Sequence, residues 1–272
     1  MSRRGVLPAR LLLLAGLAAG CAAPTLPGVE GPPAPPALRA ALLEAVVERE
    51  AAIRTLRGTA TVTVSAYGQR RRYREAFVLE AGGRLRLEQY EWTGLPAMIL
   101  VTDGEEVAVH LPFARQFLRG RATPENLDRL AGLPVAPVTL TRLLLGLPPL
   151  RVDGWRAAVL APPGAGGLAL ISGGDGAAQA LRFAPETFLL EEGELYDGGE
   201  PLLRFRFGPA ELLGGIPVPR SFTLWHVPGG AEVQVAFQAL ELNAPLPPDV
   251  FSLAVPADAG LRIVDVDREP RP

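Results

Sequence analysis

The chain has 272 residues, a length that fits one large domain or two small ones. Its hydrophobic content of 48% is ample for a core, and its single cysteine excludes a disulfide framework. The formal net charge is −2 for the whole chain and −5 without residues 1–20, which hold three arginines and no acids. This balance argues against a large basic face for nucleic acid or anionic headgroups.

The first recognisable segment is an apolar run, Leu11–Cys21, preceded by three arginines. A basic start, a short apolar core and small residues before a cut site are typical of a secretory signal peptide. The run is about half as long as a membrane-spanning helix, so it does not predict a permanent span. Leu17–Cys21 resembles the lipobox of bacterial lipoproteins, which implies cleavage after Gly20 and a lipid on Cys21. The alternative is an ordinary signal peptide with a chance cysteine.

The residues after this cysteine bear on location and flexibility. Ala22 is not the aspartate associated with inner-membrane retention in lipoproteins of this class, so the resemblance implies a lipid anchor in the outer membrane, facing the periplasm. Several acyl chains hold a protein on a membrane far better than one. Residues 22–36 are dense in proline and glycine and predict an extended tether. We therefore expect a signal peptide at 1–20, lipidated Cys21 with its tether at 21–36, one folded domain at 37–267 and a tail at 268–272.

Residues 37–56 have the period of an amphipathic helix. Pro36 suits its start and Gly58 suits its stop. Apolar side chains recur near one face, while most charged side chains fall off it. The apolar positions are Leu38, Leu42, Ala45, Val46, Ile53 and Leu56.

From Thr59 the period drops to two, which predicts strands. Ala60, Val62 and Val64 share one face of the first strand. Arginines and glutamates occupy the opposite face of the strands that follow. The sheet is therefore expected to have one apolar face and one face exposed to solvent. The predicted strands are Thr59–Ser65, Arg70–Glu80, Arg84–Trp92, Met98–Thr102 and Glu105–Leu111.

Two short helices are expected next. Thr123 is a good N-cap with Pro124 in the first turn, and this helix runs to Leu130. The second covers Pro137–Leu145 and ends at Gly146. Short strands then return at Gly167–Ser172, Ala180–Phe183, Leu202–Phe207, Ser221–His226 and Ala231–Leu240.

This order of elements predicts an α+β fold with a single antiparallel sheet. A sheet this long tends to curl on itself, so its apolar face becomes the inside of an open barrel. The N-terminal helix and the helical pair at 123–146 are the elements available to cover that face. No internal repeat or internal domain boundary is visible in 37–267.

Several segments resemble the LolA/LolB superfamily, the periplasmic carrier and outer-membrane receptor of bacterial lipoprotein sorting. They are Leu56–Ala60, Gly132–Val135, Leu144–Pro148, Asn243–Pro247 and Phe251–Pro256. The resemblance covers about residues 37–267. It implies an unclosed antiparallel half-barrel of roughly eleven strands, strongly curved, with a helical lid over an apolar cavity. The chain departs from the best-known receptors in being longer between Leu150 and Phe207, which leaves the receptor role open.

LolB-like receptors carry an apolar residue on a protruding loop that hands lipoproteins to the membrane. Leu95 is the best match to that residue here, and Trp92 adds a ring that favours membrane interfaces. The alternative is that both side chains fold back into the core. The expected cavity lining is Val62, Val64, Phe77, Leu79, Leu85, Leu87 and Val109, with lid contacts from Leu42, Val46, Leu130, Leu143 and Leu144. A register off by one residue would exchange the two faces.

Nothing in the sequence argues for catalysis, a metal or a cofactor. His110 and His226 lie in predicted strands without ligand spacing around them. The run Arg70–Arg72 is expected to be a solvated strand face, with contact to anionic headgroups or a partner as the alternative.

Two functions remain open. The first is an outer-membrane lipoprotein that binds acyl chains of lipids or lipoproteins and aids their delivery to that membrane, with a periplasmic carrier protein as a further partner. The second is a non-enzymatic structural or adaptor lipoprotein of an envelope complex, which uses the same fold as a docking surface. Nucleic acid is not an expected partner of either.

Overall fold

The computed structural model describes residues 31–132, 134–150, 156–160, 167–174, 176–257 and 260–268. Cys21 and most of the predicted tether lie outside these residues. The helices are α1 (Pro36–Ala52), α2 (Pro124–Ala131) and α3 (Pro137–Leu144). The strands of the large sheet are β1 (Thr55–Ala66), β2 (Gln69–Glu80), β3 (Arg84–Tyr90), β4 (Pro96–Thr102), β5 (Glu106–Leu111), β6 (Gln116–Arg121), β7 (Arg156–Leu160), β8 (Leu168–Gly174), β9 (Ala177–Phe183), β10 (Leu190–Asp197), β11 (Glu200–Phe207), β14 (Ser221–His226), β15 (Ala231–Leu242) and β16 (Arg262–Asp265). A separate hairpin pairs β12 (Ala210–Leu213) with β13 (Ile216–Pro219).

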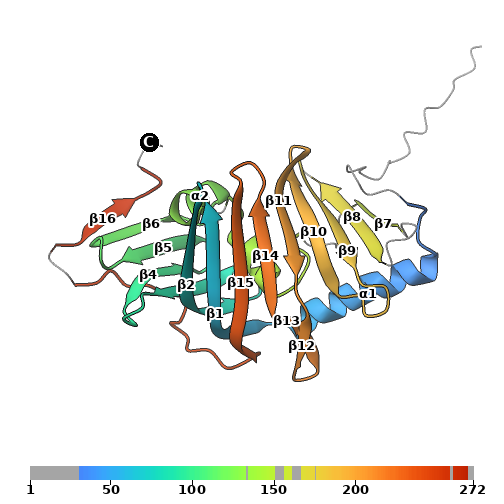
Figure 1. Cartoon of the computed structure of the whole chain (residues 1–272), viewed down its shortest axis with the longest axis horizontal. Helices are drawn as coiled ribbons and strands as arrows, with labels where there is room; N and C mark the ends of the chain where they lie inside the picture. Colours follow the sequence, from blue (N-terminus) through green and yellow to red (C-terminus); the bar gives the residue numbers. More distant parts are fainter. Residues whose placement is uncertain are drawn as a thin grey trace, which may run out of the picture.

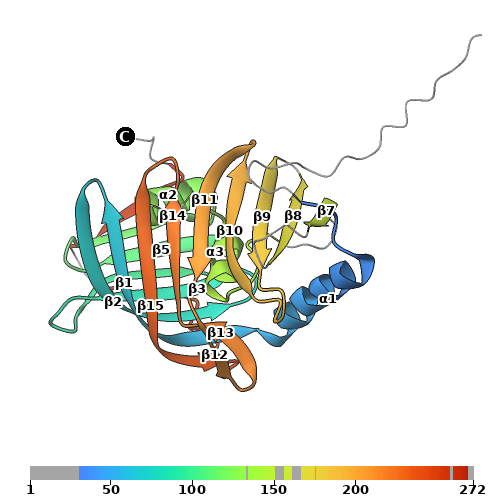
Figure 2. The same ribbon diagram turned by 45° about the vertical axis from the view of Figure 1, so that its right-hand side comes forward.

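One curved sheet organises the described part of the chain. Its fourteen strands run in the order β16-β6-β5-β4-β3-β2-β1-β15-β14-β11-β10-β9-β8-β7, and the two edge strands do not meet (Figures 1 and 2). The predicted curved α+β fold is therefore confirmed, but the expected count of eleven strands is wrong. The sheet is also not purely antiparallel, because β16 pairs with β6 in parallel.

The alternation of side chains sets which face of the sheet is covered. On β1 and β2 the buried residues include Val62, Phe77 and Leu79, while Thr63 and Arg72 belong to the opposite face. Removing such apolar side chains from water is the main force that holds helices against one face of the sheet. The predicted register is correct for these strands.

The junction between α1 and β1 differs from the prediction. The helix ends at Ala52 and the strand begins at Thr55, so Gly58 lies inside the strand and is not a helix stop. Asn243 explains the early end: its side-chain oxygen accepts hydrogen bonds from the backbone N–H of Arg54 (2.9 Å) and Thr55 (3.3 Å), and its amide donates to the carbonyl of Ala52 (2.8 Å).

Gly58 has a different role, at a register shift between β1 and β15. A Cβ atom at this position would collide with the backbone oxygen of Ala239. Glycine is needed here because two backbones approach closely.

The two short helices form where the sequence predicts them. Thr123 caps α2 by accepting a hydrogen bond from the backbone N–H of Asn126 (3.3 Å). Gly132 and Gly146 follow α2 and α3 with positive φ angles of 68° and 71°. Helix α3 packs on β2 and β3, and α2 packs on β6.

Helix α1 lies beside the β7–β10 end of the sheet, away from α2 (Figures 1 and 2). Its apolar side chains Leu42 and Val46 are buried in the core there. Among the helices of the described residues, none has the length and apolar character needed to cross a membrane.

Candidate functional site

A cavity of about 580 Å³ lies on the covered face of the sheet. Its walls come from β1–β4 on one side, from β14 and β15 on the other, and from α2 and α3 above. Most of the side chains that line it are apolar. The volume falls in the range of sites that bury small molecules.

The floor of the cavity is aromatic. The rings of Phe77 and Phe237 lie 5.3 Å apart between centroids, and those of Phe222 and Phe237 lie 6.2 Å apart. Tilted aromatic pairs of this kind are favourable beyond the area they bury. They form the base of the cavity on β2, β15 and β14, with β1 between the first two of these strands.

The structure places part of the predicted lining at the cavity. Val62, Val64, Phe77 and Leu87 line it from the sheet. The predicted positions Leu79, Leu85 and Val109 do not line it, because they are fully buried in the packed core. Helix α3 packs over the β2–β3 region that holds Leu79 and Leu85, which leaves no open space above them.

The predicted lid is also only partly at the cavity. Leu130 of α2 and Leu144 of α3 line it. Leu143 is buried in the core on another side of α3. Leu42 and Val46 belong to α1, which contributes no lining residue, so the expectation that α1 is part of the lid is wrong.

The far wall was not predicted. It consists of inward-facing residues of β14 and β15, among them Leu224, Val233 and Val235. The period-2 pattern of these strands was visible in the sequence. The pattern does not show that β15 pairs with β1. That pairing places Val235 of the far wall opposite Val62.

A carboxyl group also faces the cavity. Glu75 lies on β2 between Ala60 of β1 and Gln89 of β3, and all three line the space. In the described part of the chain, no hydrogen bond or ion pair of the Glu75 side chain is present. Burial raises the pKa of this carboxyl to about 7. Its position two residues before Phe77 on the same strand face was the available sequence signal.

The loop between β3 and β4 projects into solvent. Trp92 is 92% exposed and Leu95 is 57% exposed, so the alternative that they fold back into the core is wrong. The loop is closed by hydrogen bonds from the N–H of Glu91 to the oxygen of Leu95 (3.0 Å) and from the N–H of Gly94 to the oxygen of Glu91 (2.9 Å).

Neither histidine belongs to a metal cluster. Within the described ranges, no group of three His, Cys, Asp or Glu residues could hold a metal ion. His226 lines the cavity, and the ring of His110 lies 6.3 Å from that of Phe117. The three arginines Arg70–Arg72 line a separate hollow on the other face of the sheet.

No protein-family model matches the sequence, and no curated protein matches it either. Three solved bacterial structures share the fold. A DUF1329 family protein from Desulfovibrio piger has a TM-score of 0.60 at 12% identity, over 78% of this chain and 96% of its own. A LolA superfamily protein from Nitrosomonas europaea has a TM-score of 0.57 at 14% identity, over 79% and 97%. A "putative outer membrane lipoprotein-sorting protein domain" from Vibrio parahaemolyticus has a TM-score of 0.56 at 14% identity, over 77% and 95%. At these identities the likeness establishes the LolA-type fold, as the sequence resemblance implied.

Proposed function

We propose, on the premise that the chain has a LolA-type fold, that it is a non-enzymatic envelope lipoprotein that binds acyl chains in its cavity and aids their delivery to the outer membrane. The observation that carries this proposal is the open, mainly apolar cavity between the sheet and helices α2 and α3. The anchor would be Cys21, the cysteine of the lipobox-like segment.

The physics of such a carrier rests on hydrocarbon burial. Each methylene removed from water is worth about 0.8 kcal/mol. Sheltering even part of an acyl chain therefore makes a carrier state accessible in an aqueous compartment. No nucleotide is required if the cavity holds the chain less tightly than the membrane that accepts it.

The fold comparisons support the part of this proposal that places the protein in lipoprotein transport at the bacterial envelope. One similar structure is described as a LolA superfamily protein, and another carries a name that refers to lipoprotein sorting at the outer membrane. The exposed side chains of Trp92 and Leu95 fit a loop that enters the acceptor membrane, because an indole ring prefers the interface and a leucine prefers the hydrocarbon.

The test uses the full chain with Cys21→Ser, which removes the predicted acylation site. We expect lipid to co-purify with the protein, as detected by organic extraction and mass spectrometry, and an acylated peptide to bind where the same peptide without the acyl chain does not. An empty protein that ignores the acylated peptide would overturn the proposal.

The adaptor hypothesis predicts a different outcome of the same purification. A docking surface with its hollow plugged by its own side chains would yield one stoichiometric protein partner and no lipid. The open volume beside Val64 and Leu144 favours the carrier over this alternative.

A further inference from the structure

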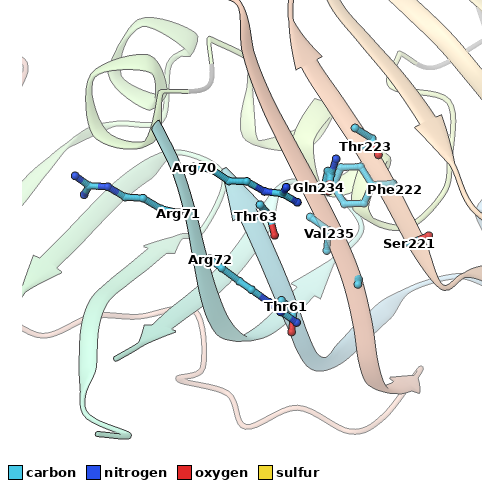
Figure 3. Close-up of a pocket in the computed structure, with 11 residues that line it drawn as sticks. Thr61, Thr63, Arg70, Arg71, Arg72, Ser221, Phe222, Thr223, Gln234 and Val235 are labelled. Atoms are coloured by element: carbon cyan, nitrogen blue, oxygen red, sulfur yellow. The ribbon is translucent and has the colours of Figure 1, made fainter. Parts of the chain in front are cut away.

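A second hollow, of about 600 Å³, lies on the outer face of the sheet, opposite the cavity. Figure 3 shows Arg70 and Arg72 extending from β2 across β1, whereas Arg71 points away from them. The register explains this arrangement, because Arg70 lies opposite Ser65 and Arg72 opposite Thr63, on the face that Thr63 shares with Gln234 of β15. Two guanidinium groups therefore converge on one hollow.

Besides the arginines, the hollow is lined by apolar side chains, among them Phe222 and Val235, and by neutral polar groups. The polar groups include the hydroxyls of Thr63, Ser221 and Thr223 and the amide of Gln234. Glu232, two residues from Gln234, accepts hydrogen bonds from Trp225 and from Gln234 itself. Hydroxyl and amide groups of this kind add hydrogen bonds to an anion without adding negative charge.

Arg70 and Arg72 outnumber the acids beside this hollow, where Glu232 lies across Ser65 from Arg70. Elsewhere on the same face arginines are paired: Arg206 with Glu192 at 2.8 Å and Arg204 with Glu194 at 2.6 Å. Within the described ranges, no acidic side chain forms an ion pair with Arg70 or Arg72. Two guanidinium groups that form no ion pair are suited to phosphate, which they bind through charge-assisted hydrogen bonds.

An apolar rim lies close to this hollow. The antiparallel order of the strands places the β1–β2, β3–β4, β5–β6 and β14–β15 turns at the same end of their strands. Because the sheet is curved, these turns follow an arc from the β14–β15 turn at the top of Figure 2 to the β3–β4 loop at its left. These turns carry exposed apolar side chains, with Tyr67 96% and Phe113 63% exposed. We define the rim as Tyr67, Trp92, Leu95, Phe113 and Val227.

The arginines lie behind the rim along β2. Arg70 is three residues from Tyr67 and Arg72 is five, or about 10 and 17 Å along an extended strand. Amphipathic rings settle at the level of lipid headgroups, and long arginine side chains reach from there to phosphates. The cavity opens at the same end, since Tyr67, His226 and Gly229 contribute to its wall.

We propose that this end of the protein docks on a phospholipid bilayer, with the rim in the interface and with Arg70 and Arg72 binding lipid phosphate groups. The proposal does not depend on what occupies the cavity. A protein that carries no acyl chain would dock in the same way.

The test is vesicle flotation of the full chain with Cys21→Ser, at fixed ionic strength. Vesicles contain either phosphatidylcholine alone or phosphatidylcholine with phosphatidylglycerol. We expect binding to the anionic vesicles, and we expect Arg70→Gln/Arg72→Gln to weaken it about 20-fold, since each basic residue near an anionic surface contributes about fivefold. The matched control is Arg204→Gln/Arg206→Gln, which removes two charges from the same face and should change binding less than twofold.

Two further substitutions test the hollow and the rim separately. Thr223→Glu places a carboxylate at the hollow without touching either arginine, and it should also weaken binding to anionic vesicles. Trp92→Ser should weaken binding to both kinds of vesicle, whereas Leu212→Ser, an exposed residue on the β12–β13 hairpin, should not. Equal effects of the two arginine pairs would overturn the proposal, as would binding to polyglutamate but not to vesicles.

Discussion

Arg142 of α3 forms a two-pronged ion pair with Glu50 of α1, with Nη1 to Oε1 at 2.6 Å and Nη2 to Oε2 at 3.2 Å. The Nε atom of Arg142 donates to the backbone oxygen of Pro148 at 2.7 Å. This pair joins the helix that covers the cavity to the helix at the far end of the sheet. Helix α1 does not line the cavity, but it helps to fix the helix that does.

The first prediction concerns this ion pair. Arg142→Ala should lower the free energy of unfolding by about 3–5 kcal/mol, because it removes a buried guanidinium with its two bonds to Glu50 and its bond to the oxygen of Pro148. Urea denaturation measures the loss. The control is Arg57→Ala, which breaks the exposed pair with Glu241 and should cost less than about 1 kcal/mol. Equal costs of the two substitutions would contradict the role assigned to Arg142.

A second prediction concerns the junction between α1 and β1. Asn243 adopts a positive φ of 55° and its side chain bonds to three backbone groups. Asn243→Gly keeps the backbone freedom but loses these hydrogen bonds, and should cost about 2–3 kcal/mol. Asn243→Ala should cost about 1 kcal/mol more, because alanine resists a positive φ. Urea midpoints that leave both variants at the wild-type value would show that the junction does not depend on this side chain.

A third prediction concerns pH. The carboxyl of Glu75 has an ordinary pKa of 4.5, and burial raises it to about 7 in the folded protein. Between these values the folded state holds a proton that the unfolded state has released, so this contribution to stability is full below pH 4.5 and falls as the pH rises to about 7. The loss is at most about 3 kcal/mol, and less because the carboxyl is partly exposed.

Glu75→Gln should flatten the profile of unfolding free energy over this range and raise stability at pH 8. Urea midpoints at pH 5, 6, 7 and 8 provide the measurement. Glu44→Gln on the exposed face of α1 is the matched control and should keep the wild-type profile. An unchanged slope in Glu75→Gln would mean that the carboxyl does not titrate in this range.

A fourth prediction separates transfer from binding. Leu95 is exposed on the β3–β4 loop and takes no part in the cavity wall. Leu95→Glu should slow the transfer of a fluorescent acyl probe from the protein to vesicles at least tenfold while leaving the affinity for the probe unchanged. Leu212→Glu, at an exposed leucine outside the rim, should alter neither quantity. Equal losses of transfer and affinity in Leu95→Glu would discredit the loop assignment.

How much the sequence could predict depends on the range of the interactions involved. Side-chain alternation is local, so the inward faces of β1 and β2, with Val62 and Phe77, were readable from the sequence. The cap at Thr123 was readable for the same reason. The parallel docking of β16 on β6 and the end of α1 at Asn243 rest on contacts between residues far apart in the chain, which no local pattern contains.

The same distinction between local patterns and long-range contacts applies to the cavity. Leu79 and Val62 have the same pattern of alternation, but only Val62 meets open space, because α3 fills the volume above Leu79. Which inward-facing residues line a cavity is decided by where the helices pack. Glu75 also has a local sequence signal, because it is an acid on an apolar strand face.

The most direct test of the account measures whether acyl chains occupy this cavity. Val64 lines it and Val47 lies exposed on α1, so Val64→Trp fills the space while Val47→Trp makes the same change outside it. In equilibrium titrations with a fluorescent fatty-acyl probe, we predict that the wild type and Val47→Trp bind alike. We predict that Val64→Trp binds at least tenfold more weakly with its melting temperature unchanged, a loss equivalent to about two methylenes of contact. Probe binding by Val64→Trp at wild-type affinity, or no binding by the wild type, would contradict the account.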